Sequence, residues 1–311
     1  MIGPHPLRSG LISKTIMETE KLLLEQVIYQ GELVQVGLFR CPLSRTDFAE
    51  AGPITGHLLV FPRTSVCITQ DGKEPVIASP NVVMYYNRGQ PYRRSPVSAR
   101  GDMCEWFAYA PVVVAEALRS YDMRIEEHWE QPFDFTHGPS DPASYLMQRQ
   151  IVEHVLHHQE PDWLFVEETS LWVLGRALER AFEKKESTRS RANHSQRSLA
   201  HHLQAILSTR FNETLTLEGL SSELGYSPYH LSHVFRWQTG VSIHQYLNQI
   251  RLRTALEMIS GGCSDLTQLA INLGYNHHSH FSMAFRKSFG APPSQIRDHA
   301  FLSTLDHRAT I

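Results

Sequence analysis

The chain has 311 residues, of which 41% are hydrophobic and 20% are charged, and its formal net charge at pH 7 is −3. This length predicts two domains, and the composition is typical of a soluble globular protein. No apolar run approaches the length that a transmembrane helix needs, so the sequence argues against a membrane protein.

The N-terminal residues and the cysteines indicate where the protein works. The first residues lack an apolar core of signal-peptide length, and the four cysteines are scattered without CxxC spacing. We therefore expect reduced thiols, a cytoplasmic location and no membrane partner. Residues 1–20 are expected to form a loosely ordered arm.

Residues 27–110 have the pattern of a series of short β-strands. They are rich in branched and aromatic residues, and turn signals such as Asp71-Gly72 separate them. The expected strands are residues 27–29, 33–39, 57–61, 65–68, 75–78, 81–86 and 104–109. Many short strands at this spacing predict a small barrel or jelly roll.

Arginines and aromatic residues gather in one part of this β region. Tyr85, Arg88, Arg93 and Arg94 could form the mouth of a pocket for an anionic or aromatic effector. The alternative is an exposed arginine-rich loop that makes surface ion pairs, which is the more ordinary behaviour of such charges. His57 is the only histidine in the strand region, so we expect no metal, no cofactor and no catalytic residues there.

Three helices are expected after the strands, at residues 111–119, 141–160 and 162–185. Asp141 is a capping residue, and a proline follows it where the first helical turn tolerates one. Both longer helices have broad apolar faces, which could close the side of the barrel or pair with a second subunit. Residues 186–195 are polar and lack periodicity, so they are expected to form a linker.

Residues 216–297 contain one pattern twice. Leu231, Phe235 and Gly240 of the first copy each have a counterpart 50 positions later. Each copy predicts a helix, a turn around a glycine, and a second helix with a buried stripe and a polar outer face, which is the helix-turn-helix arrangement. A helix at residues 196–209 is expected to precede the first copy.

The two copies share residues at matching positions with a known family. The matching residues are Leu-Gly-Tyr-Ser-Pro-Tyr-His-Leu-Ser-His-Val-Phe-Arg at 224–236, the helix at 251–259, and Phe-Ser-Met-Ala-Phe-Arg-Lys-Ser-Phe-Gly-Ala-Pro-Pro at 281–293. The sequence resembles the DNA-binding domain of AraC/XylS-type transcriptional regulators over roughly 100 residues. This resemblance implies double-stranded DNA as a partner, a cupin-like sensor domain before the repeat, and pairing into a homodimer.

Residues 242–259, which join the two copies, are predicted to form one long helix with an apolar stripe of Ile243, Tyr246, Leu247, Ile250, Ala255 and Ile259. A rigid connector would fix the distance between the two copies. If both second helices enter successive major grooves, that distance is about 34 Å.

The resemblance also assigns roles within the second helix of each copy. Base-reading positions fall on Tyr229, Ser232 and His233 in the first copy, and on His278, Ser279, Ser282 and Met283 in the second. Arg236, Arg286 and Lys287 are better placed for phosphate, and His230 and His277 could also reach the backbone. Met283 departs from the usual polar or basic reader, because a thioether can touch a thymine methyl group but cannot hydrogen-bond. The histidines at 277, 278 and 280 lack the i, i+4 spacing of helical metal ligands, so no metal is expected there.

The sequence thus predicts a two-domain α+β protein. Residues 21–185 would form a cupin-like β-barrel with flanking helices that senses an effector and dimerises. Residues 196–300 would form an all-α DNA-binding domain with two helix-turn-helix motifs, followed by a tail at 301–311. The predicted function is sequence-specific, effector-responsive transcriptional regulation, with RNA polymerase as a further candidate partner. Two alternatives remain open: a constitutive DNA-binding protein whose barrel only dimerises, and a cupin enzyme with an appended DNA-binding domain.

Overall fold

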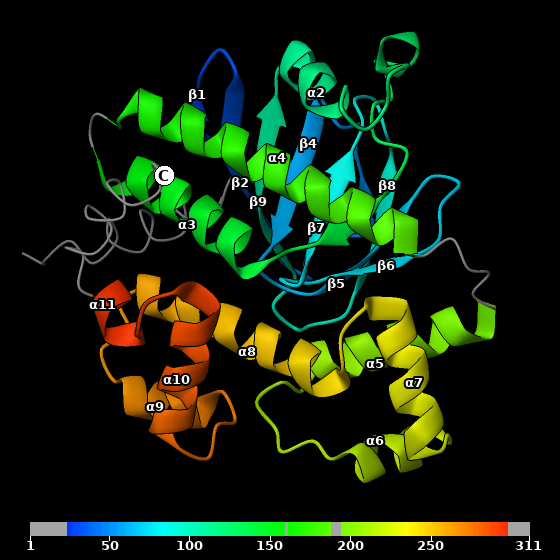
Figure 1. Ribbon diagram of the computed structural model, residues 1–311, viewed down its shortest axis with the longest axis vertical. Coiled ribbons are helices and arrows are strands. Elements are labelled where there is room, and N and C mark those ends of the chain that lie inside the picture. The colour runs from blue at the N-terminus through cyan, green and yellow to red at the C-terminus, as the bar shows by residue number, and fades with distance from the viewer. Residues whose placement is uncertain (1–23, 159–160, 188–193, 298–311) are drawn as a thin grey trace, which may run out of the picture.

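The computed structural model describes residues 24–158, 161–187 and 194–297. A β-rich half and an all-helical half lie against each other, with helix α4 (Trp163–Ser187) at the end of the first and helix α5 (His194–Thr209) at the start of the second (Figure 1). The expected arm and tail fall outside the described residues, as does most of the expected linker.

The strands of the described chain pair into two antiparallel sheets. The larger sheet has the order β1-β2-β9-β4-β7-β10, and the smaller has the order β3-β8-β5-β6. The strands are β1 (Glu25–Gln30), β2 (Val34–Cys41), β3 (Glu50–Ala51), β4 (His57–Pro62), β5 (Val66–Gln70), β6 (Val76–Ala78), β7 (Val82–Tyr86), β8 (Tyr92–Pro96), β9 (Asp102–Tyr109) and β10 (His137–Pro139).

A closed barrel was expected, but within the described residues no ladder joins the two sheets into a ring. Instead the sheets enclose a shared apolar core, to which the larger sheet contributes Met84 and Trp106 and the smaller contributes Val66 and Ile68. Strands β3 and β6, at the ends of the smaller sheet, are two and three residues long, too short to continue the pairing around a ring.

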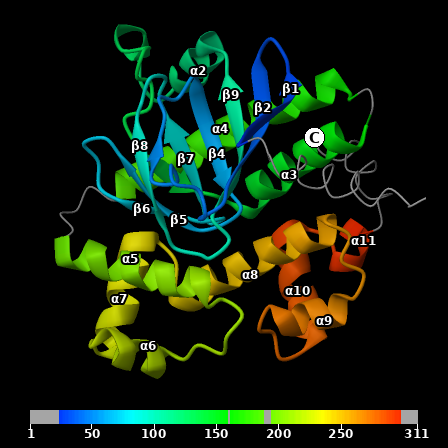
Figure 2. The same cartoon turned by 180° about the vertical axis from the view of Figure 1, so that it is seen from behind.

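Helices α3 (Pro142–His157) and α4 cover the opposite face of the larger sheet (Figures 1 and 2). As the sequence predicted, Asp141 caps α3, and its Oδ1 accepts from the amides of Ala143 at 3.0 Å and Ser144 at 3.2 Å. Two buried tyrosines of the sheet donate to backbone carbonyls of α4: Tyr85 to Ala177 at 2.7 Å and Tyr109 to Ser170 at 2.8 Å. These bonds fix α4 on the sheet while its other face stays open.

Strand β4 shows why the sequence of a central strand in the larger sheet is mostly apolar. All six of its residues are buried. Leu59 and Phe61 face the core under α3 and α4, while Leu58 and Val60 face the core between the sheets. Both faces of the strand are covered, so the alternation of a half-exposed strand is absent. Short α2 (Pro111–Leu118) and a 3-10 turn at Ile125–Glu127 follow β9.

The helical half contains the two expected helix-turn-helix units. Helices α6 (Leu217–Leu224) and α7 (Pro228–Thr239) form the first, and α9 (Leu266–Asn272) and α10 (His278–Phe289) form the second. Ser227 caps α7 by accepting from the His230 amide at 3.2 Å, and Gly225 adopts the left-handed φ of +73° that ends α6. Helix α8 (Ile243–Ser260) joins the units, and α11 (Pro293–Arg297) ends the described chain.

Helix α8 is buried on most sides because it lies between the two units and the β half. Beyond the predicted apolar stripe, Arg253 and Glu257 also point away from solvent; Arg253 is only 1% exposed. Arg253 donates to the Asn81 side-chain oxygen and to the Ser140 carbonyl, both in the β half. The connector therefore belongs structurally to both halves of the molecule.

Tyr246, Arg253 and Glu257 together form a polar face of α8. The Tyr246 hydroxyl lies 3.0 Å from Ser79 Oγ, and the Tyr246 carbonyl accepts from the Asn81 side-chain nitrogen at 3.0 Å. One helical turn beyond Arg253, the Glu257 carboxylate pairs with Arg63 and lies 3.0 Å from Arg149 Nε. Residues 246, 253 and 257 follow the spacing of one helix face, so a single side of α8 docks onto the β half.

Candidate nucleic-acid interface

Helix α7, the second helix of the first unit, has a buried back and an open front. Leu231, Val234 and Phe235 are buried in a core shared with α5 and α8. On the front, Tyr229 is 80% exposed, and its ring stacks nearly parallel to that of His233 with centroids 6.0 Å apart. Because the buried side holds the helix in place, the front can enter a groove of DNA without unfolding the domain.

The other α7 residues expected to contact DNA also lie on this front. His230 and Arg236 are exposed, and Ser232 is half-buried. The His230 ring stacks on that of Tyr226, with centroids 5.3 Å apart. Positions 229, 232, 233 and 236 follow the spacing of one helix face, so these candidates form one surface.

Helix α10 repeats the arrangement in the second unit. Phe281, Phe285 and Phe289 are buried, and Met283 is 66% exposed on the opposite side. The other expected contacts are exposed or half-buried on that side or at the start of the helix: His277, His278, Ser279, Ser282, Arg286 and Lys287. The structure thus brings the predicted residues together as two surfaces, one for each helix.

Arg251 on α8 connects the two units, a role that the sequence pattern did not reveal. Its Nε donates to the Phe211 carbonyl at 2.6 Å and its Nη2 to the Glu213 carbonyl at 2.9 Å, both in the segment between α5 and α6. The same guanidinium lies 5.6 Å from the centre of the Tyr275 ring in the second unit. Tyr275 in turn donates to Asn248 of α8 at 2.6 Å. Through these contacts α8 is tied both to the segment before α6 and to the residue that lies shortly before α10.

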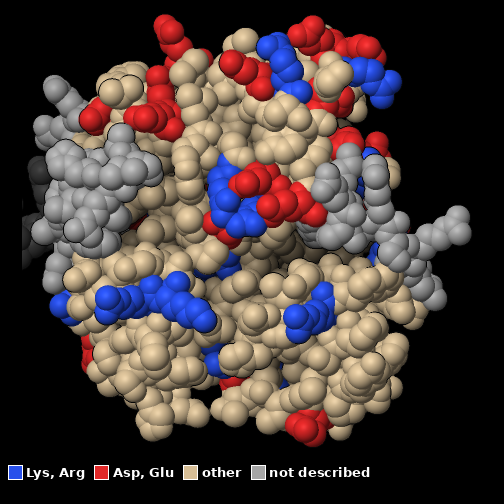
Figure 3. Space-filling model, viewed as in Figure 1, with Lys and Arg blue, Asp and Glu red and all other residues tan. Residues whose placement is uncertain are grey.

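The charge on the helical half is mixed but tends to positive. Residues 193–311 hold nine Lys and Arg against seven Asp and Glu. In the view of Figure 3, basic side chains lie in separate patches over this half, and acidic ones are sparse on that face. Arg210 is neutralised locally, because it pairs with Glu213 and Glu223 at 2.8 Å each. Phosphate contacts would therefore depend on a few arginines and on helix N-termini.

The four residues expected to bind an effector do not come together. Tyr85 is buried under α4, as described above, and Arg88 and Arg93 are exposed. Only Arg94 lines a cavity of about 340 Å³ between the two sheets. Sequence reasoning missed its partner Asp102, whose Oδ2 lies 3.2 Å from Arg94 Nη1.

This buried pair gives the cavity a polar point within an apolar lining. Burial raises the pKa of the Asp102 carboxyl, and the charge of Arg94 opposes that rise. The Arg94 guanidinium also donates to the Phe48 carbonyl at 2.9 Å and lies 4.9 Å from the centre of the Phe39 ring. Its hydrogen-bonding groups are thus largely engaged by the protein itself.

No three His, Cys, Asp or Glu side chains converge as metal ligands in the parts of the chain that the structure covers. Among the helices of those same parts, none is both long and apolar enough to cross a membrane.

Comparison with known proteins places the helical half. Residues 220–299 match the family model described as a helix-turn-helix domain. The transcriptional activator RhaS of Escherichia fergusonii is 31% identical over 97 residues, covering 31% of this chain and 35% of that protein. The regulatory protein PocR of Salmonella typhimurium is 26% identical over 91 residues, covering 29% of this chain and 30% of that protein. The chain thus spans about a third of the length of these relatives, which are described as regulators and not as enzymes.

Two solved structures are similar in part. The C-terminal domain of AraT, a response regulator from Geobacillus stearothermophilus, has 30% identity and covers 35% of this chain and 88% of its own, with a TM-score of 0.31. ToxT from Vibrio cholerae has 11% identity and covers 86% of this chain and 98% of its own, with a TM-score of 0.33. The expected resemblance holds for the C-terminal part of the chain, which is an AraC-type helix-turn-helix domain, and the relatives that match it are transcriptional regulators.

Proposed function

We propose that the protein is a sequence-specific, DNA-binding transcriptional regulator that reads double-stranded DNA with α7 and α10. The observation that carries this proposal is the pair of exposed helix faces, each backed by a buried core and both tied to α8. Tyr229 and His233 on α7 are the main base-reading residues, and Arg236, Arg286 and Lys287 contact phosphate. RNA polymerase is a further candidate partner, and the cytoplasm is the expected location.

The β half, for which we keep the expected bounds of residues 21–185, would form the dimer. Of its two long helices, α3 is covered on several sides, because Tyr145 and Leu146 pack into the core of the second unit. Helix α4 instead keeps an open apolar face with Leu164 at 74%, Leu171 at 37% and Trp172 at 46% exposure. Residues 164, 171 and 175 follow helical spacing, and Gly175 has open space around it. A second copy of α4 is the occupant that fits this stripe.

The β half would also respond to a small effector in the cavity between its sheets. Support comes from the apolar lining, which includes Trp106, and from the buried polar pair of Arg94 and Asp102. A cavity of this volume suits a small metabolite. The alternative remains a regulator whose β half only dimerises.

A binding-site selection with the full-length protein tests the DNA proposal. We expect one enriched motif, and an affinity for it that falls steeply as salt concentration rises, because phosphate neutralisation releases counterions. Random recovery of sequences, or retention that does not depend on salt, would contradict the proposal. Repeating the selection with candidate metabolites separates an effector-responsive regulator from a constitutive one.

A further inference from the structure

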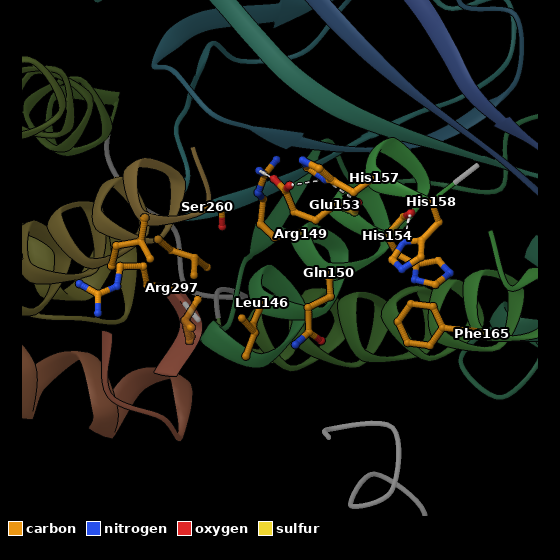
Figure 4. A pocket seen from close by; sticks show the side chains of 13 residues that line it. Leu146, Arg149, Gln150, Glu153, His154, His157, His158, Phe165, Ser260 and Arg297 are labelled. Carbon is orange, nitrogen blue, oxygen red and sulfur yellow. Dashed lines mark hydrogen bonds and ion pairs between the residues drawn. The ribbon is translucent and has the colours of Figure 1, made fainter. Parts of the chain in front are cut away.

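A second pocket lies where the two halves meet, outside the cavity between the sheets. Its volume is about 470 Å³. Helix α3 forms one wall with Leu146 and Gln150, and the other wall comes from Leu256 and Ile259 at the end of α8 and from Ile296 on α11. Figure 4 shows the side chains that line it. A molecule bound here would touch the β half and the DNA-binding half at once.

The pocket has an apolar end and an aromatic end. Leu146, Leu256, Ile259 and Ile296 are buried at the end near α8 and α11. At the other end the His154 ring lies 4.9 Å from the Phe165 ring and 4.3 Å from the His158 ring, measured between centroids. In Figure 4, Leu146, Gln150 and Phe165 lie on the same side of α3. A ligand with an aromatic ring system at one end and an apolar group at the other matches these two ends of the pocket.

Between the two ends lies a buried amide group whose nitrogen is unpaired among the described residues. Gln150 is one helical turn from both Leu146 and His154, and the residue is only 8% exposed. Within the described residues, its Nε2 has no hydrogen-bond partner. Buried polar atoms in folded proteins are almost always paired, so an unpaired donor in a pocket wall suggests an acceptor that a ligand brings. The neighbouring Arg149 is already engaged, because its Nη1 and Nη2 lie 2.5 Å from Glu105 and Glu153 and its Nε lies 3.0 Å from Glu257.

We propose that this pocket binds a small aromatic molecule bearing a carboxylate or carbonyl oxygen, which accepts a hydrogen bond from Gln150. The pocket walls come from both halves, so the ligand stabilises the docked arrangement of α3 against α8 and α11. A ligand bound here would also change the affinity for DNA, through linkage along α8, and that part of the inference rests on the proposed function. Binding of the ligand itself is independent of that function and is measured without DNA.

The test uses two probes with the same ring and opposite polar groups: 1-naphthaleneacetate and 1-naphthylmethylamine. Calorimetric titration of the full-length protein should detect binding of the acid and much weaker binding of the amine. Gln150→Leu should weaken binding of the acid about tenfold, because one hydrogen bond is lost. Gln150→Glu should reverse the preference toward the amine. Gln268→Leu, the same change at an exposed position on α9, is the matched control and should leave both affinities unchanged.

Three outcomes would overturn the proposal. The first is no binding of the acid at millimolar concentration, and the second is equal binding by the wild type and Gln150→Leu. The third is binding that appears only in a variant ending at Arg297, which would assign the pocket to residues 298–311 of the chain itself. Thermal unfolding of each variant shows whether a loss of binding reflects a loss of the fold.

Discussion

Replacing Glu105 with glutamine should remove a pH-dependent cost to stability at the boundary between the two halves. Five charged side chains meet there, and three carboxylates (Glu105, Glu153, Glu257) share two guanidinium groups (Arg63, Arg149). One carboxylate is therefore in excess unless His157, whose Nδ1 lies 3.2 Å from Glu153 Oε2, carries a proton. Glu105 has a fully buried side chain, so it is the group for which ionisation is hardest.

The size of the effect follows from the pKa of Glu105. Burial raises this pKa from 4.5 to about 7, opposed by Arg149 and reinforced by the charge of Glu257. The folded state then holds the proton more tightly than the unfolded chain does. The cost is absent below the unfolded pKa of 4.5, grows as the pH rises, and is complete above about 7. A difference of this size corresponds to about 3 kcal/mol of unfolding free energy.

The assay is urea unfolding of the full-length protein, followed by tryptophan fluorescence between about pH 5 and pH 8. The wild type should lose stability across this range, and Glu105→Gln should lose less because its amide cannot ionise. The control is Glu126→Gln, at an exposed ion pair with Arg119. An unchanged pH slope in Glu105→Gln, or a variant that is much less stable than the wild type at high pH, would refute the reasoning. The first result would mean that the pKa of Glu105 is not raised in the folded protein, and the second that the ionised network is attractive as a whole.

Four further changes test the other surfaces and the contact between the two halves. His233→Ala should relax sequence preference at one or two base pairs in a binding-site selection, and an unchanged motif would contradict its reading role. Arg286→Ala should weaken binding to all sequences alike and reduce the slope of log affinity against log salt by about 1, as expected for one lost phosphate contact. Trp172→Glu should convert a dimer to a monomer in sedimentation, and a protein that is monomeric before the change would exclude the α4 interface. Arg253→Met should destabilise the protein by about 2 kcal/mol in urea unfolding, because it leaves the Asn81 oxygen and the Ser140 carbonyl without their donor. An unchanged stability would show that the desolvation of the buried guanidinium offsets the free energy of its hydrogen bonds.

The helix-turn-helix units were predictable because their signals are local. A serine before Pro228 and a glycine at 225 mark the ends of two helices, and the structure places the cap and the left-handed residue there. The apolar spacing of Leu231 and Phe235 fixed which side is buried. The outer side, and with it the candidate DNA surface, then followed by exclusion.

The β half was less predictable because strand pairing depends on distant residues. Strand β8 (Tyr92–Pro96) contains two arginines and a proline, so its sequence resembled a loop. Its neighbours β3 and β5 nevertheless hold it in the smaller sheet, and Arg94 points inward to Asp102. No periodicity rule places a guanidinium inside a core, because its partner lies on another strand.

The polar face of α8 was missed for a related reason. Tyr246 was assigned to an apolar stripe, while Arg253 and Glu257 had the residue types of an exposed surface. Their burial depends on a second domain whose position the local sequence does not encode.

That same face has a consequence for how the chain is made. Synthesis proceeds from the N-terminus, so the β half leaves the ribosome before α8 does, and domains generally fold as they emerge. Until α8 arrives, Arg63 and Arg149 lack Glu257, and Asn81 lacks Arg253. The waiting surface is thus partly charged and can be hydrated, which disfavours sticking to other nascent chains. Helix α8 then docks onto polar groups that are already in place on the β half, and this docking determines the positions of α7 and α10.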